Sequence, residues 1–405
     1  MTVTDRLGRL CEVEFLLGAM RESLAAGGAY LVARRYPNGP ICHARNVSYV
    51  HKACWGMYAA GVDRGIIAEL LDWLQREALQ PNGDFYFPEE GPEYRVMQRA
   101  YRPLTFMKVA VWLAHPLAAN ERVIGRLLQY QHRSGGTFNY IGDDPARVEE
   151  QPTLGALNTS FFGHLMLALG DKQRALQTGD FLVRLVEANR PHLEQGLFYT
   201  QMDLAGNLVT EAPPGQRYSR LVDRRLPKQE FWQTGTTMAY LACLYEALRE
   251  RWQEPTQAQK YLDAALALLP FEAAMPLESY LWPSKCKVGW GAGELLRVLV
   301  KYRLGSEEQV EQAYQVAKKV AVHTFMRAQL PNGAWSAMHY PLSELDPEYQ
   351  LEYTPIRGRV NVPQEPVPGW SKLYLPPEEI TGEFLGELEA IYRGMQAYLA
   401  FLRGC

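Results

Sequence analysis

Hydrophobic positions recur along this chain with a helical period, in two kinds of segment. In the first kind, such as 66–79 and 308–326, apolar residues lie three and four positions apart with charged residues between them, which predicts helices with one solvated face. The second kind carries small and aromatic residues and few charges in its early turns, which predicts helices buried on most sides. Its members are 47–62, 104–113, 154–169, 231–248, 288–302 and 384–402.

A short motif, a glycine followed two residues later by an aromatic side chain, separates the solvated segments from the buried ones. The copies are Gly28-Ala29-Tyr30, Gly83-Asp84-Phe85, Gly136-Thr137-Phe138, Gly196-Leu197-Phe198 and Gly333-Ala334-Trp335. The first four are about 53–60 residues apart, and the last gap leaves room for one degenerate copy within 270–282. Six units of two helices then fill the chain, and a repeat of this length indicates stacked helical hairpins.

These patterns predict a single all-α domain over residues 1–405, in which six helical hairpins close into an (α/α)6 toroid with inner and outer helix rings. Connections from inner to outer helices are short, whereas those from outer to inner helices are long. We therefore expect the long connections at one end of the ring, around the N-termini of the inner helices. They are 27–44, 81–93, 134–152, 191–227, 271–283 and 331–378, of which 191–227 and 331–378 are the longest.

The expected working face carries positive charge from two sources. Six inner helices would direct their N-terminal N–H groups and positive dipole ends toward the same rim, which favours anionic groups. The fourth long connection adds Arg217, Arg220, Arg224 and Arg225. A substrate with a carboxylate or a phosphate fits this arrangement.

Composition limits the classes of function. Apolar residues make up 47% of the chain, charged residues 21%, and the formal net charge is −3, which provides a large core but no overall basic character for nucleic acid. The first twenty residues mix charges with apolar positions and show no cleavage site, and no apolar run approaches the roughly 18 residues of a membrane span. Six dispersed cysteines without a C-x-x-C pair indicate a reducing compartment. We expect a cytoplasmic enzyme for a small molecule.

Several motif copies resemble known toroidal enzymes. Gln329 begins Gln-Leu-Pro-Asn-Gly-Ala-Trp, and Gln80 and Gln131 begin looser copies, which resemble the Q-x-x-x-G-x-W repeat of terpenoid cyclases and protein prenyltransferases. The segment 196–206 resembles a hairpin of N-acylglucosamine 2-epimerase-like enzymes, and 233–240 is similar to an inner-helix segment of unsaturated glucuronyl hydrolases. These resemblances imply an α/α toroid that acts on a carbohydrate or on an isoprenoid-like chain.

The catalytic signatures of these families are absent from the sequence. Asp143-Asp144 is followed by Pro145 and does not make the acidic D-x-D-D cluster of squalene-type cyclases. The R-H-x-x-W element of the epimerases is missing. Cys42-His43 and Cys286 lack the companions that zinc-dependent members use, so we expect neither a metal nor another cofactor.

Four residues are candidates for acid–base catalysis. Glu230 and His51 open inner helices, His339 follows Trp335 in the longest connection, and Glu294 follows three glycines in 289–293. Each has a structural alternative: a helix cap for Glu230, a hydrogen-bonded core histidine for His51, an exposed loop histidine for His339, and close helix packing around Glu294. Glu383 and Glu387 also share one helix face, which is a catalytic pair if it points inward and solvated surface if it points outward.

Further residues are candidates for substrate binding. Tyr101 and Arg102 begin the second inner helix, where Arg102 would clamp an anion or pair with Glu89, Glu90 or Glu93. Trp232 and Trp290 would form stacking walls or simply belong to the core. Tyr49, near His51, and Arg224 complete the set.

Three functions follow from these candidates. The favoured hypothesis is a sugar-active epimerase or glycoside hydrolase for a small carbohydrate, with anionic carbohydrates included. The alternative is a terpenoid-cyclase-like enzyme of natural-product biosynthesis with an aromatic-lined cavity, and the third is a toroid that binds a ligand or partner without catalysis. The residues that line the cavity distinguish these functions, because polar groups between aromatic rings favour a sugar and nearly continuous rings favour a cyclase. The sequence contains no signal for an oligomeric state.

Overall fold

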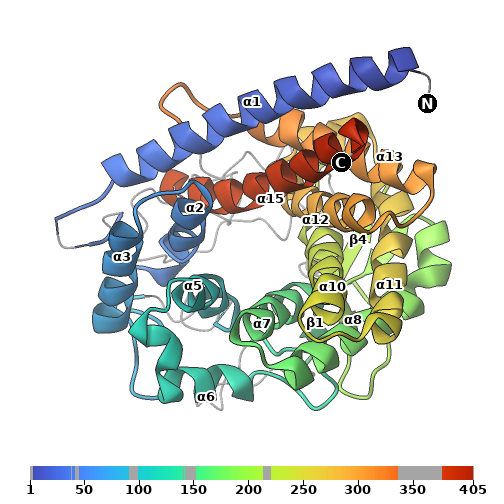
Figure 1. The fold of residues 1–405 in the computed structure, drawn as a ribbon. Coiled ribbons are helices and arrows are strands. Elements are labelled where there is room, and N and C mark those ends of the chain that lie inside the picture. Colours follow the sequence, from blue (N-terminus) through green and yellow to red (C-terminus); the bar gives the residue numbers. More distant parts are fainter. Residues whose placement is uncertain are drawn as a thin grey trace.

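The computed structural model describes residues 3–37, 39–41, 45–90, 99–139, 141, 152–212, 220–335 and 376–404. Within these ranges twelve α-helices alternate between an outer and an inner position around one ring, so the predicted all-α toroid is confirmed (Figure 1). The outer helices are α1 (Val3–Ala33), α3 (Arg64–Glu77), α6 (Glu121–Gln129), α8 (Lys172–Glu194), α11 (Pro255–Ala273) and α13 (Glu307–Lys319). The inner helices are α2 (Ala53–Ala59), α5 (Tyr101–Trp112), α7 (Ala156–Leu169), α10 (Trp232–Glu250), α12 (Cys286–Tyr302) and α15 (Pro377–Arg403).

Short elements connect the helices. They are the 3-10 helices η1 (Val47–Tyr49), η2 (Pro116–Ala119), η4 (Leu277–Leu281) and η5 (Pro283–Lys285), the π-helix η6 (Val320–Met326), and the strands β1 (Leu154–Gly155), β2 (Leu197–Tyr199), β3 (Gln201–Met202) and β4 (Leu221–Asp223). Strand β1 pairs antiparallel with β3, placing Leu154 opposite Met202, and β2 pairs antiparallel with β4. None of the described helices is both long and apolar enough to cross a membrane.

The described parts of the long connections contact one another in chain order. The Arg45 side chain reaches Glu89, and the Ala100 N–H donates to the Asn139 carbonyl. Farther round the ring, Thr153 donates to Gln201 at 2.8 Å and Ser284 donates to the Gln229 carbonyl at 2.6 Å. These contacts join neighbouring connections, or residues next to them, from the first to the fifth. That all six long connections lie at one end of the ring stays a prediction.

The repeated glycine motif forms a tight turn after an outer helix. In the sixth hairpin, Gln329 and Trp335 form an antiparallel bridge around Gly333, whose φ of +87° is in the left-handed region that favours glycine. A Cβ on Gly333 would overlap the Ala26 carbonyl of α1, and the Gln329 amide donates to the Ser23 carbonyl of the same helix at 2.9 Å. The turn therefore packs against the next outer helix, and in the sixth hairpin that helix is α1, so the contact closes the ring.

Several predicted boundaries are wrong for local reasons. The Gly28 copy of the motif lies inside α1, which continues to Ala33. The predicted helix 47–62 is divided into η1 and α2, because Asn46 caps the short 3-10 helix and Val50 leaves helical geometry at φ −123°. Helix α15 begins at Pro377, well before the expected start at 384, because a proline suits the first helical turn.

Candidate active site

Three glutamates of α15 point toward the middle of the ring. Glu379, Glu383 and Glu387 are spaced four residues apart, so they lie on one helix face, and all three are fully buried. This decides the orientation that the sequence left open for Glu383 and Glu387. A stack of three buried carboxylates is costly unless positive groups compensate it.

Two buried lysines supply that compensation. The Lys52 ammonium, at the start of α2, lies 2.7 Å from Glu379 Oε1 and 2.5 Å from Glu383 Oε2. The Lys287 ammonium, in the first turn of α12, pairs with Glu383 and lies 3.3 Å from Glu387 Oε1. Burial by itself would lower the pKa of Lys52, but the Glu379 carboxylate outweighs it and raises that pKa. Lys52 is therefore charged at neutral pH.

Glu379 is the member of this cluster whose pKa is raised. Three carboxyl groups face two amino groups in an interior that strongly disfavours uncompensated charge. Burial raises the pKa of the Glu379 carboxyl, although Lys52 opposes the shift. Its Oε2 atom has no hydrogen-bond partner within the described residues. The raised pKa favours the protonated form of this carboxyl, which is the form that can donate a proton.

His51 adds a neutral imidazole beside this acid. Its Nδ1 lies 3.1 Å from the Ser48 carbonyl, which assigns the ring proton to Nδ1, and burial together with Lys52 and Arg102 holds the pKa of His51 well below its usual range. The other ring nitrogen, Nε2, lies 3.9 Å from Glu379 Oε1 and has no hydrogen-bond partner in the described ranges. An acid and an available base thus stand next to each other.

Cys286 places a thiol beside two of these carboxylates. Its Sγ and one oxygen each of Glu383 and Glu387 lie within 4.8 Å of one another, so the three could hold a metal ion. Two features weigh against that role: burial raises the pKa of the Cys286 thiol well above its usual range, and metals bind the thiolate. The Lys287 ammonium also already pairs with both carboxylates. The expectation that the chain uses no metal stays a prediction.

Aromatic rings from five inner helices form a continuous wall beside the charged cluster. The contacts run from His51 to Tyr101 (5.5 Å between ring centres), on to Phe161 (4.7 Å) and to Trp290 (5.5 Å). Trp55 contacts Trp290 at 5.1 Å, and Gly386 of α15 makes room for it because a Cβ there would overlap the indole. His164 stacks on Trp290 at 4.7 Å and contacts Tyr240, and the Lys287 ammonium lies 5.3 Å from the Trp232 ring.

Two predicted residues have charged partners in the structure, and their binding and catalytic roles stay predictions. Arg102 is fully buried, and its Nη1 donates to Glu90 at 2.9 Å and to Ser48 at 3.2 Å, which confirms the salt-bridge alternative. Glu294 lies 2.9 Å from Arg297 and 2.8 Å from Arg393, farther along α12 than the charged cluster. The glycines before Glu294 serve close helix packing, since a Cβ on Gly291 would overlap the α10 backbone.

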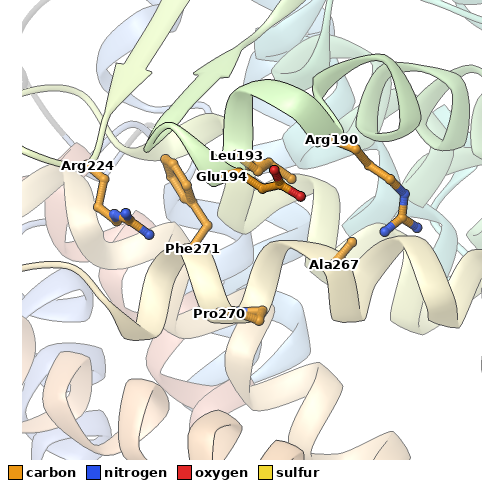
Figure 2. A pocket seen from close by; sticks show the side chains of 7 residues that line it. All are labelled: Arg190, Leu193, Glu194, Arg224, Ala267, Pro270 and Phe271. Carbon is orange, nitrogen blue, oxygen red and sulfur yellow. The ribbon is translucent and has the colours of Figure 1, made fainter.

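The remaining predicted residues lie in different surroundings. Glu230 and Tyr49 are buried beside the starts of α10 and α2, where their catalytic and binding roles stay predictions. His339 lies outside the described residues. Arg224 lines a surface pocket of about 290 Å³ between the outer helices α8 and α11, where Figure 2 shows Glu194 between Arg224 and Arg190. The structure thus separates Arg224 from the buried cluster.

Comparisons with known proteins give distant structural similarity only. No protein-family model matches the sequence, and curated protein sequences give no match. A single-residue variant of the type II terpene cyclase MstE from Scytonema is similar at a TM-score of 0.47 and 14% identity over 94% of this chain and 99% of that chain. MstE itself is similar at a TM-score of 0.44 and 15% identity, over 92% and 98% of the two chains.

Sequence reasoning missed three members of the cluster: Lys52, Lys287 and Glu379. Lys52 follows His51 directly, and Lys287 follows Cys286, so both stand at the start of a predicted inner helix. A charged residue in a segment otherwise free of charge was the signal that could have found them. Glu379 was missed because the helix was expected to begin at residue 384.

Proposed function

We propose that this chain is a cyclase-type enzyme that begins its reaction by protonating an apolar, isoprenoid-like substrate. The observation that carries the proposal is the fully buried Glu379 carboxyl, whose pKa is raised by burial, next to a continuous aromatic wall. A general acid must be protonated at the working pH, and desolvation raises the pKa of Glu379 in that direction.

Transfer of the proton leaves a carboxylate on Glu379 and a positive charge on the substrate. The carboxylate is stabilised at once by the Lys52 ammonium, which lies 2.7 Å from Oε1. The cation faces the rings of Tyr101, Phe161, Trp55 and Trp290, and aromatic faces attract cations by roughly 0.5–2 kcal/mol each. Both products of the first step therefore have a partner already in position.

The last step of a cyclisation removes a proton from the carbocation. His51 Nε2 is suited to accept it, because the pKa of this imidazole is lowered by burial and its lone pair has no other partner in the described ranges. The 3.9 Å between Nε2 and Glu379 Oε1 allows the proton to return to Glu379 after a small movement. In this scheme Glu379 is the acid and His51 the base.

The arrangement of the aromatic rings and the charged groups favours this function over the sugar-active alternative. In a sugar site polar groups are distributed between the rings so that each hydroxyl finds a partner. Here the charged groups gather in one compact cluster of mutual ion pairs, Lys52, Lys287 and the three glutamates, while the rings contact one another directly. We therefore prefer the cyclase function.

The test replaces the acid without changing its shape. Glu379→Gln should lower turnover of a cyclised isoprenoid by roughly 10²–10⁴-fold while the protein stays folded. The matched control, Glu389→Gln on the same helix, removes a carboxylate that pairs with Arg393 at 2.8 Å and should retain activity. The assay incubates the protein with polyprenyl alcohols and diphosphates and, in parallel, with uronates and amino sugars, and analyses products by mass spectrometry.

The pH dependence gives a second readout. Because the reactive form of Glu379 is protonated, the rate should fall as pH rises through its raised pKa, and Glu379→Gln should remove that limb of the profile. Full activity of Glu379→Gln, or turnover of sugars but not of isoprenoids, would show that the proposed function is wrong.

A further inference from the structure

Lys108 is a buried amine that the acid step does not use. It lies seven residues after Tyr101 on α5, so it is about 10 Å farther along the axis of the helix. Its Nζ is 3.5 Å from the centre of the Trp55 ring, with Trp290 at 5.2 Å and Phe161 at 5.3 Å. Within the described residues this nitrogen makes neither a hydrogen bond nor an ion pair, and the side chain is 2% exposed.

The amine is held between rings and not against a carboxylate. The charged and titratable groups that act on it electrostatically are Glu387 on α15, Glu294 and Lys287 on α12, Cys243 on α10 and His164 on α7. Burial outweighs the carboxylates and lowers the pKa of Lys108 to about 7. About half of the molecules thus carry a free lone pair at neutral pH, whereas fewer than about one in a thousand exposed lysines do.

We propose that Lys108 binds an aldehyde covalently, as an imine enclosed by the aromatic rings. A desolvated lysine amine is the nucleophile that proteins use toward carbonyl groups. The rings of Trp55, Trp290 and Phe161 restrict the partner to an aldehyde on an isoprenoid-like or other apolar chain, because a hydrated polar chain would lose its water without gaining hydrogen bonds there.

The step is balanced without an oxidant or reductant. The Nζ lone pair attacks the carbonyl carbon, the C–N bond forms, and the C=O pair moves to oxygen. One proton passes from nitrogen to oxygen, a second makes the hydroxyl leave as water, and a C=N bond remains. One molecule of water is released for each aldehyde bound.

The imine would anchor one end of a substrate whose other end reaches Glu379. This anchoring role rests on the proposed function, whereas formation of the imine at Lys108 does not. Since Tyr101 contacts both His51 and Phe161, the wall continues from the acid to the amine. A chain bound along it would carry its aldehyde at Lys108 and its reacting double bond near Glu379.

The experiment traps the imine by reduction. Wild-type protein is incubated at pH 7 with farnesal, an isoprenoid aldehyde, and sodium cyanoborohydride, and the modified lysines are mapped by peptide mass spectrometry. We expect Lys108 to be labelled at least about tenfold faster than the exposed Lys260, given the difference in neutral amine. Lys108→Arg, which keeps the cation but forms no imine, should lose the adduct, and the control Lys260→Arg should keep it.

Two further measurements complete the test. Farnesol, which has the same chain and no carbonyl, should slow labelling of Lys108 in the wild type, and this arm does not depend on a variant folding. Labelling spread evenly over surface lysines, or unchanged labelling in a folded Lys108→Arg protein, would overturn the proposal. Glu379→Gln should still form the adduct. If this variant forms the adduct and also keeps full turnover, the acid function of Glu379 is wrong and the imine at Lys108 still stands.

Discussion

At the scale of single residues, the candidate site consists of ionisable side chains removed from water. His51, Tyr101 and Trp290 could be named from the sequence because they stand in early turns of segments that are otherwise uncharged. Lys52 and Lys108 were passed over, since a lysine in a sequence is typical of solvent-facing positions. A charge in a segment otherwise free of charge was the local sign of their burial, but the inner helices that enclose them are distant in the chain.

Lys108 should make the stability of the protein depend on pH. Its pKa is lowered to about 7 in the folded chain and is about 10.4 in an unfolded one, so unfolding takes up a proton between these values. The free energy of unfolding contributed by this group therefore rises with pH, by up to roughly 1.4 kcal/mol per unit between about pH 7 and 10.

Lys108→Met isolates this contribution. The variant should be more stable than the wild type near pH 7, and the difference should shrink toward pH 10, as measured by urea unfolding at several pH values. A difference that does not change with pH would mean that Lys108 keeps its ordinary pKa in the folded protein.

At the scale of elements, the distinction between solvated and buried helices was predictable, and so was the turn that follows an outer helix. The hydrophobic periodicity of a segment indicates which of its faces is buried, and the glycines of the motif indicate a backbone conformation that other residues rarely adopt. The ends of inner helices were predicted less well, because residues such as Pro377 extend a helix through capping geometry that hydrophobic periodicity does not register. Because the predicted start of α15 was seven residues too late, Glu379 was not recognised as part of this helix.

Gly333 provides the sharpest test of the turn. Gly333→Ala should destabilise the protein by more than about 2 kcal/mol, because it combines a left-handed backbone with overlap of Ala26. The control is Gly8→Ala in α1, where an added Cβ meets nothing within 4 Å and should stabilise the helix by roughly 0.5–1 kcal/mol. Chemical denaturation of both variants measures the contrast, and equal effects would contradict the role assigned to the turn.

At the scale of the whole molecule, the first outer helix and the last inner helix form one pair. Arg6 Nε donates to the Leu402 carbonyl at 2.6 Å, and Arg403 lies 2.5 Å from Glu14. The start of α1 and the end of α15 therefore meet (Figure 1). The repeat count in the sequence predicted six hairpins, and this contact shows how the sixth is completed.

A circular permutant should consequently fold. Joining residue 404 to residue 3 through about ten Gly/Ser residues and opening the chain between Gly61 and Val62, in the short turn after α2, retains every helix. We expect a thermal transition close to that of the parent chain. Opening the chain between Phe162 and Gly163, inside α7, should abolish folding, and similar behaviour of the two permutants would contradict the closed ring.

The pairing of α1 with α15 also determines what happens during synthesis on the ribosome. The apolar face of α1, which includes Val13, Leu17 and Met20, is made first, and the helix that covers it is made last. At about 5–20 residues per second, α1 waits tens of seconds for its partner. Until α15 emerges, the apolar face of α1 therefore lacks the partner that covers it in the folded chain.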